Sequence, residues 1–195
     1  MDKAMQIRDA ATVVLQRDDG RVLMGQRGHG AVFMPGKFVF PGGAVDAADF
    51  EATPIGTLAP ACLRRLCIDA DRAVAGALAV AALRELREET GLVLRDAAAL
   101  SFVFRAVTPP GRPRRFDARF FLADAAHLET DPDDFSRAED ELSHLQWLSP
   151  LEARAFDLPF VTRIVLAEIE ATSGAPDHVP FYDHRGSVGR VRALT

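Results

Sequence analysis

The sequence predicts a domain of mixed α/β or α+β class, and three observations lead to that prediction. Short strand-like runs lie on both sides of one long helical segment, at about residues 72–90. Shorter helical segments follow towards the end of the chain. With 195 residues, 48% of them hydrophobic, the chain can bury one core but is short for two. We therefore expect one domain over residues 1–195.

The first predicted elements form a hairpin. Residues 11–17 and 21–27 are β-rich runs, and Asp18-Asp19-Gly20 lies between them. An Asp-Gly pair favours a tight turn, because glycine tolerates the positive φ that the turn needs. Glycines and prolines then interrupt residues 28–43, which contain the apolar run at 38–40.

Further along, one strong helix stands out. Residues 46–71 give mixed signals, because prolines and glycines break any long element there. Asp71 can cap the amino end of helix 72–90, and Gly91 stands where a left-handed residue ends a helix. After this helix we expect strands at 101–107, 116–123 and 142–148. A capping box at 149–152 and a helix at 160–171 follow. The tail after Ser173 is turn-rich, with an extended piece near 178–182.

Composition and charge argue against several classes of protein. The net charge is −5 and there is no dense basic face, so nucleic acid is not an expected partner. The longest apolar run, residues 73–83, has 11 residues, whereas a bilayer span needs about 20. No secretory signal is visible near the start, and Cys62 and Cys67 fit neither a disulfide framework nor a metal motif. We expect a cytoplasmic protein without a membrane partner, and a homodimer stays open.

Three glutamates near the carboxyl end of the long helix conflict with helix physics. At about 100° per residue, Glu85, Glu88 and Glu89 fall within one arc of roughly 100°. Like charges four residues apart repel, and the helix dipole disfavours each acid in the last turn by roughly 0.3–1 kcal/mol. Glu85 and Glu89 also continue the line of apolar residues that should face the core, where unpaired carboxylates are costly. The pattern indicates a positive group beside them.

Two kinds of positive group remain open at this point. Arg84 lies four residues before Glu88, so an internal ion-pair network accounts for Glu88 but does not reach the Glu85/Glu89 line. A divalent cation accounts for all three acids, because converging carboxylates suit Mg²⁺ or Mn²⁺. The turn at Gly42-Gly43 adds backbone groups that can approach an ion or a phosphate, although a plain tight turn is the alternative.

Together these residues resemble the Nudix hydrolase family, whose signature is G-x5-E-x7-R-E-U-x-E-E-x-G-U with U aliphatic. The second half matches without a gap, and Gly43 supplies the opening glycine. The matching residues are Arg84, Glu85, Leu86, Glu88, Glu89, Gly91 and Leu92. The resemblance implies an α/β/α sandwich around a mixed β-sheet. It also implies divalent-metal-dependent hydrolysis of a diphosphate that links a nucleoside to another group.

The chain departs from the signature in its first half. Between Gly43 and Arg84 lie 40 residues where the family pattern has 13, so 27 residues are inserted, at about 46–72. Counting back from Arg84 places Gly76 where the family has its first glutamate, which is usually a partner of the arginine. Three acids are candidates to replace that glutamate as the partner of Arg84: Asp69, Asp71 and Glu51.

The resemblance implies roles for individual residues. Glu85, Glu88 and Glu89 are the expected ligands of Mg²⁺ or Mn²⁺, together with the Gly42 carbonyl, and Arg84 positions a carboxylate. Family members often take another carboxylate from a later loop as a ligand or general base. Glu141 is our first candidate for it, Glu139 and Asp140 are competitors, and an exposed acidic turn is the alternative. A general base among the helix glutamates themselves also stays open.

The substrate is expected to be a small nucleoside diphosphate derivative. Residues 36–43 and the segment 115–121 are similar to motifs of a branch that resembles coenzyme A diphosphatases. Coenzyme A or an acyl-CoA is therefore favoured, and an ADP-ribose-like compound comes next. Arg27 and Arg115 are candidates for binding substrate phosphates, with a surface ion pair and a solvated loop as their alternatives. Because of Gly76, a Nudix-like sensor domain that binds a nucleotide without cleaving it is the rival function.

Overall fold

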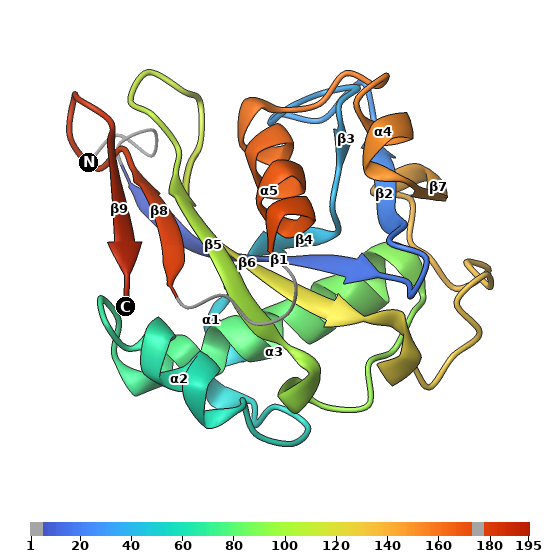
Figure 1. Cartoon of the computed structure of the whole chain (residues 1–195), viewed down its shortest axis with the longest axis horizontal. Coiled ribbons are helices and arrows are strands. Elements are labelled where there is room, and N and C mark those ends of the chain that lie inside the picture. The colour runs from blue at the N-terminus through green and yellow to red at the C-terminus, as the bar shows by residue number, and fades with distance from the viewer. Residues whose placement is uncertain (1–5, 173–177) are drawn as a thin grey trace.

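The computed structural model describes residues 6–172 and 178–195, and it contains one large mixed sheet with helices on both sides (Figure 1). The start of the predicted tail after Ser173 lies outside the described residues. In chain order the elements are β1 (Ile7–Gln16), β2 (Val22–Arg27), β3 (Phe38–Val39), β4 (Gly42–Ala44), α1 (Ala47–Glu51), α2 (Pro60–Leu66), α3 (Arg72–Thr90), η2 (Ala97–Ala99), β5 (Ser101–Val107), β6 (Arg115–Asp124), η3 (Ala125–His127), β7 (Leu142–Leu148), α4 (Pro150–Ala153), α5 (Phe160–Ala171), β8 (Val179–Asp183) and β9 (Arg190–Leu194).

The sheet combines parallel and antiparallel pairs, which confirms the predicted mixed class. Its main path runs β3-β2-β1-β6-β5-β8-β9, with β4 paired to β1 and β7 paired to β2. The parallel pairs are β1 with β6 and β5 with β8, and all the other pairs are antiparallel. Strand β1 is central, because β2, β4 and β6 all pair with it.

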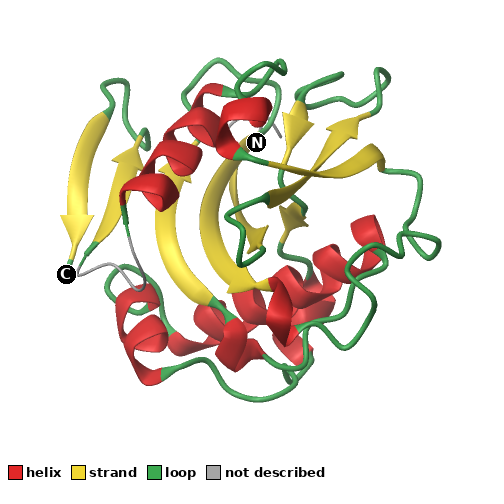
Figure 2. Cartoon of the chain, turned by 45° about the vertical axis from the view of Figure 1, so that its right-hand side comes forward, coloured by secondary structure: helices red, strands yellow, loops and turns green. Residues whose placement is uncertain are grey.

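Two hydrophobic cores lie on opposite faces of this sheet, so the domain has three layers. Alternate residues of β1 face opposite ways: Val13 joins the core under α3, and Val14 joins the core under α5. Figure 2 shows helices above and below the curved strands. No helix among the described residues is long and apolar enough to cross a bilayer.

Local signals predicted several element boundaries correctly. Helix α3 begins at Arg72 and ends at Thr90 as expected; β5, β7, α5 and the Ser149–Glu152 capping box also agree with the sequence. Gly20 has the expected positive φ of 81°. The hairpin itself is short, however, because β1 and β2 pair only at Gln16 and Val22 before β2 continues alongside β7.

Other elements were missed or misplaced. Strand β1 begins at Ile7 rather than residue 11, because its first residues pair with β6 from Arg115 onwards. Helices α1 and α2 occupy the stretch that gave mixed signals. Strand β9 was not predicted; four of its five residues are exposed, so it has no clear alternation of apolar and polar positions, and it is specified by pairing with β8.

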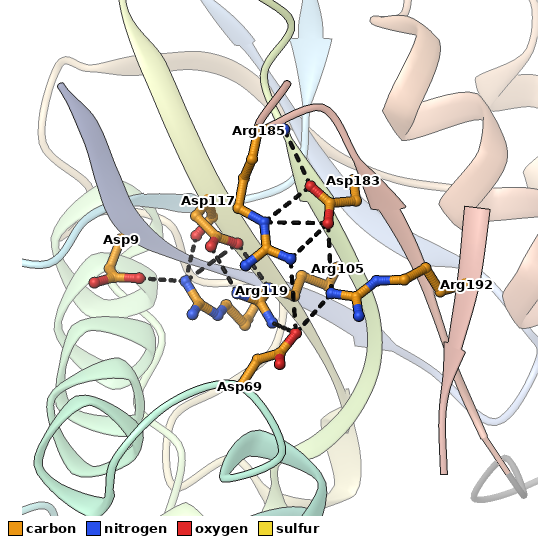
Figure 3. A network of polar contacts seen from close by, with 8 residues as sticks. All are labelled: Asp9, Asp69, Arg105, Asp117, Arg119, Asp183, Arg185 and Arg192. Atoms are coloured by element: carbon orange, nitrogen blue, oxygen red, sulfur yellow. Dashed lines mark hydrogen bonds and ion pairs between the residues drawn. The ribbon is translucent and has the colours of Figure 1, made fainter. Parts of the chain in front are cut away.

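A polar network connects the strands at one end of the sheet (Figure 3). Arg105 on β5 makes two hydrogen bonds to Asp117 on β6, at 2.8 and 2.7 Å, and a 3.3 Å ion pair to Asp69 in the loop before α3. Asp69 also accepts a 2.7 Å hydrogen bond from Arg192 on β9. The whole network consists of Asp9, Asp69, Asp117, Asp183, Arg105, Arg119, Arg185 and Arg192. Its four carboxylates balance its four guanidinium groups, and its contacts connect the loop before α3, the sheet and the β8–β9 hairpin.

Candidate active site

Helix α3 packs closely on the sheet through small residues, and both of its ends are capped. Ala75, Ala79 and Ala82 are buried in the core between α3 and the sheet, where small side chains let a helix approach closely. Asp71 accepts a hydrogen bond from Val74 N at 2.8 Å, and Gly91 ends the helix at φ +76°. The helix therefore presents its last turn to β4.

The two glycines of β4 let the glutamates lie against the backbone. Gly42 N donates a 2.6 Å hydrogen bond to Glu89 Oε2. A Cβ on Gly43 would lie 2.3–2.6 Å from the carboxylate of Glu85, so any other residue there would displace that carboxylate from its present position. The sequence predicted a backbone contribution from Gly42 through its carbonyl; the structure shows its amide bonded to a glutamate, and the carbonyl's role stays a prediction.

Glu89 is the most unusual titratable group of the site. Its side chain is only 2% exposed, and its Oε1 is buried without a hydrogen-bond partner among the described residues. Burial raises the pKa of Glu89 to about 8; the charges of Glu85 and Glu141 add to this, while the Gly42 amide and Arg27 oppose it. A buried acceptor with no donor is the feature expected where a cation binds.

Arg84 is the hub of an ion-pair network, which extends further than the sequence suggested. Its Nη1 donates to Glu85 Oε1 at 2.8 Å and to Glu88 Oε2 at 2.9 Å, and its Nη2 donates to the Ala44 carbonyl at 3.1 Å. The expectation that Arg84 could not reach Glu85 is wrong, because the guanidinium lies between both carboxylates. Arg84 makes no hydrogen bond to Glu89 among the described contacts, so that acid is left for another partner.

Asp49 on α1 holds the other side of Arg84. Arg84 donates to it through Nε and Nη2, both at 3.0 Å, and Asp49 is 2% exposed. Burial alone would raise the pKa of Asp49, but its hydrogen bonds with Arg84 and Asp46 lower it overall. This bidentate pair fixes the plane of the guanidinium.

The acids proposed from sequence as partners of Arg84 are therefore the wrong ones. Asp69 binds Arg105 and Arg192, Asp71 caps α3, and Glu51 is exposed. Counting forward from Gly43 would have found the partner, since Asp49 occupies the position of the signature's first glutamate. Counting back led to Gly76 instead, where an added Cβ would meet no atom within 4 Å.

Glu141 and Arg27 form an ion pair within electrostatic reach of the glutamates. Arg27 Nη2 donates a 2.8 Å hydrogen bond to Glu141 Oε1, so Arg27 does form an ion pair. The charge of Glu141 contributes to the raised pKa of both Glu85 and Glu89, which places it within their electrostatic reach. Glu139 lies on the same loop, and its backbone N donates to the Glu88 carbonyl at 2.8 Å.

Arg115 has a different environment from the other candidates. Its Nε donates to the Thr108 carbonyl at 3.0 Å, and its Nη2 donates to the His184 carbonyl at 2.6 Å. These bonds connect the β5–β6 loop to the end of β8. The structure does not bring Arg115 into hydrogen-bond contact with Arg84 or with the glutamates, and its role in binding substrate stays a prediction.

The residues suit a divalent cation in chemistry, although no set of three is already arranged around one. Among residues 6–172 and 178–195, no group of three or more His, Cys, Asp or Glu side chains stands in a metal-binding geometry. Glu85 and Glu88 are turned towards Arg84, and Glu89 keeps an unpaired oxygen. All three are hard oxygen donors, and Arg84 would stay bound to Asp49 if they turned away.

Comparisons with known proteins identify the family of this chain. A family model described as NUDIX domain matches residues 71–169. The crystal structure of a NUDIX hydrolase from Alicyclobacillus acidocaldarius is 28% identical, with a TM-score of 0.65, covering 86% of this chain and 92% of that one. A MutT NUDIX hydrolase from Burkholderia pseudomallei shares the fold at 24% identity and a TM-score of 0.53, covering 84% of this chain and 98% of that one. The chain belongs to the NUDIX family and is a hydrolase that acts on diphosphate bonds.

Proposed function

We propose that this hydrolase depends on Mg²⁺ or Mn²⁺ and cleaves the diphosphate linkage of a nucleoside diphosphate derivative. The observation that carries the proposal is Glu89, a buried carboxyl with one unpaired oxygen beside two further glutamates. Without a cation, the cluster costs the fold electrostatic energy at neutral pH. A bound dication would offset that cost and would neutralise the charge of the diphosphate.

Glu85, Glu88 and Glu89 would hold the cation, with the Gly42 carbonyl as a further candidate ligand. When bound, a dication polarises phosphorus–oxygen bonds and lowers the pKa of water. Arg84 would keep its place through Asp49 while Glu85 and Glu88 turn to bind the metal. Asp49 is thus a positioning residue for the helix end.

We assign the general-base role to Glu141, with the same loop's Glu139 and Asp140 as competitors. Glu141 would accept a proton from the attacking water, whose oxygen then bonds to phosphorus as the bridging phosphorus–oxygen bond breaks. The departing phosphate carries away the bridging oxygen. Arg27 donates a hydrogen bond to Glu141 and would hold that carboxylate in place, besides its predicted contact with a substrate phosphate.

The rival function, a nucleotide sensor without catalysis, loses its main argument. That argument was the apparent replacement of the first signature glutamate by Gly76. Asp49 supplies the missing carboxylate to Arg84, so the Arg84 network is complete without residue 76. We further propose that the 27 additional residues lie between Asp49 and Arg84 and include α2, within a single domain.

Coenzyme A or an acyl-CoA remains the favoured substrate, and ADP-ribose-like compounds come next. The sequence similarity of residues 36–43 and 115–121 to the coenzyme A branch supports this order. A homodimer and a cytoplasmic location stay predictions.

The test is a hydrolysis panel with Mg²⁺ and with Mn²⁺ over coenzyme A, ADP-ribose, NADH, dinucleoside polyphosphates and nucleoside triphosphates. Release of adenosine 3′,5′-bisphosphate would identify coenzyme A as the substrate. We expect Glu89→Gln to lower kcat by roughly a thousandfold or more with the fold intact by circular dichroism. Glu129→Gln, an exposed acid near η3, is the matched control and should keep its activity. If Glu89→Gln kept full turnover, the assignment of the active site to this glutamate cluster would be wrong.

A further inference from the structure

A cleft of about 260 Å³ lies beside the carboxyl end of α3, and the proposed chemistry leaves most of its lining unused. Two arginines and two glutamates supply its polar groups. The lining residues are Arg87, Glu88, Gly91, Val93, Arg137 and Glu139. Glu88 belongs to both the cleft and the glutamate cluster, so a molecule in the cleft would lie next to the reacting groups.

Backbone contacts give this cleft a fixed shape. Glu139 N donates a 2.8 Å hydrogen bond to the Glu88 carbonyl, which attaches the loop before β7 to the helix. Gly91 has φ +76°, and a Cβ there would lie 3.0 Å from Cβ of Arg137. The loop therefore passes directly over the helix end, and Arg137 is brought to the same cleft as Arg87.

Both guanidinium groups are available to a ligand. Arg87 is 64% exposed, and its nearest acid is Glu88 at 4.0 Å, a weak contact. Arg137 forms no ion pair or side-chain hydrogen bond with any residue that the structure describes. Planar guanidinium groups bind phosphate through paired hydrogen bonds. The volume is small beside ordinary ligand pockets of roughly 300–1,000 Å³, and it suits one phosphate group.

The two glutamates that line the cleft carry negative charge, which opposes the binding of an anion. Glu88 already accepts a hydrogen bond from Arg84 at 2.9 Å, and a dication at the glutamate cluster would offset the remaining charge. An anion is therefore favoured in the cleft when a divalent cation is present. This coupling predicts stronger phosphate binding with Mg²⁺ than without it.

We propose that the Arg87–Arg137 cleft binds a phosphate monoester that the substrate carries outside its scissile diphosphate. The inference rests on the proposed function, because it assumes that the diphosphate lies at the glutamate cluster. It assigns to α3 and the loop before β7 a role that the sequence had suggested for Arg115. That arginine donates to two backbone carbonyls instead.

The direct test is calorimetric titration with adenosine 3′,5′-bisphosphate and with AMP, each in the presence of Mg²⁺. Neither compound contains a diphosphate bond, so neither is consumed. We expect the wild type to bind the bisphosphate about tenfold more tightly, since charge-assisted hydrogen bonds supply the difference. The double variant Arg87→Gln/Arg137→Gln should reduce this preference to about twofold or less. Arg163→Gln, an exposed arginine on α5, is the matched control.

Three results would overturn the proposal. These are equal affinity of the wild type for both compounds, an unchanged preference in the double variant, or loss of the preference in Arg115→Ala alone. Kinetics separate the cleft proposal from the proposed function. The double variant should have a higher KM than the wild type for coenzyme A but an unchanged KM for 3′-dephospho-coenzyme A. If the wild type cleaves no diphosphate at all, the proposed function fails, and the titration still decides what the cleft binds.

Discussion

At the scale of single residues, Glu89 shows most clearly how burial prepares a site. The carboxyl accepts one hydrogen bond from the Gly42 amide, is buried, and lies within the electrostatic reach of Glu85, Glu141 and Arg27. Burial favours its neutral form, so an empty site holds a proton near neutral pH. A cation that binds there must displace this proton, and its affinity therefore rises with pH.

The same carboxyl makes the stability of the metal-free protein depend on pH. The pKa of Glu89 is about 8 in the folded chain, against an ordinary value of 4.5. Between these values the folded state binds more protons than the unfolded state, so the free energy of unfolding falls as pH rises. Above pH 8 this contribution levels off. We expect Glu89 to cost on the order of 2–4 kcal/mol at pH 8 relative to pH 5.

Urea denaturation with a chelator at pH 5, 6.5 and 8 measures this effect. Glu89→Gln keeps the shape but cannot ionise, so the difference between wild type and variant isolates the residue. We expect the variant to be the more stable protein at pH 8. Parallel stability curves for the two proteins would contradict the raised pKa.

The Arg84–Asp49 pair predicts a loss of stability when it is broken. Asp49→Asn leaves the guanidinium with one fewer charged partner in a place where Asp49 is 2% exposed. We expect a loss of about 2–3 kcal/mol in the free energy of unfolding. Asp157→Asn, which breaks the exposed pair with Lys37, should cost less than about 1 kcal/mol. Equal losses would show that burial of Asp49 has no energetic consequence.

At the scale of elements, two glycines of the α3 segment should respond to alanine in opposite directions. Gly76 lies inside the helix, and an added Cβ meets nothing within 4 Å, so Gly76→Ala should stabilise by about 0.5–1 kcal/mol. Gly91 has φ +76°, and its Cβ would press on Arg137 and on the backbone of Ala138. Gly91→Ala should therefore destabilise by about 1–2 kcal/mol. Thermal unfolding of both variants checks this: the midpoint temperature should rise for Gly76→Ala and fall for Gly91→Ala.

The sequence predicted those elements whose limits are set by local chemistry. Asp71 and Gly91 define α3, and the capping box at Ser149 defines the start of α4. By contrast, the limits of β1 and the existence of β9 depend on pairing with strands distant in the sequence. Such pairing leaves little trace in a single segment, because it depends on the partner strand.

At the scale of the whole molecule, the network of Figure 3 attaches the end of the chain to the rest. Asp69 bonds Arg192 on β9 at 2.7 Å and Arg105 on β5 at 3.3 Å. Asp69→Ala removes the link between the loop before α3 and the β8–β9 hairpin. We expect faster amide hydrogen exchange in β9, by about tenfold, with little change in β1. Asp133→Ala, which removes an exposed partner of Arg17, is the control. A uniform change over all strands would contradict a local attachment.

The sequence by itself determined the α/β class, the limits of α3 and the acids at its end, because turns, caps and charge repulsion act between near neighbours. Counting forward from Gly43 points to Asp49, and the tertiary structure shows that Asp49 binds Arg84. Tertiary structure alone decided that the Gly42 amide binds Glu89. It also decided that Arg137 lies beside Arg87 and that Arg115 donates to backbone carbonyls. These contacts join residues about 7 to 69 positions apart, and their energy depends on burial and orientation that only the folded sheet creates.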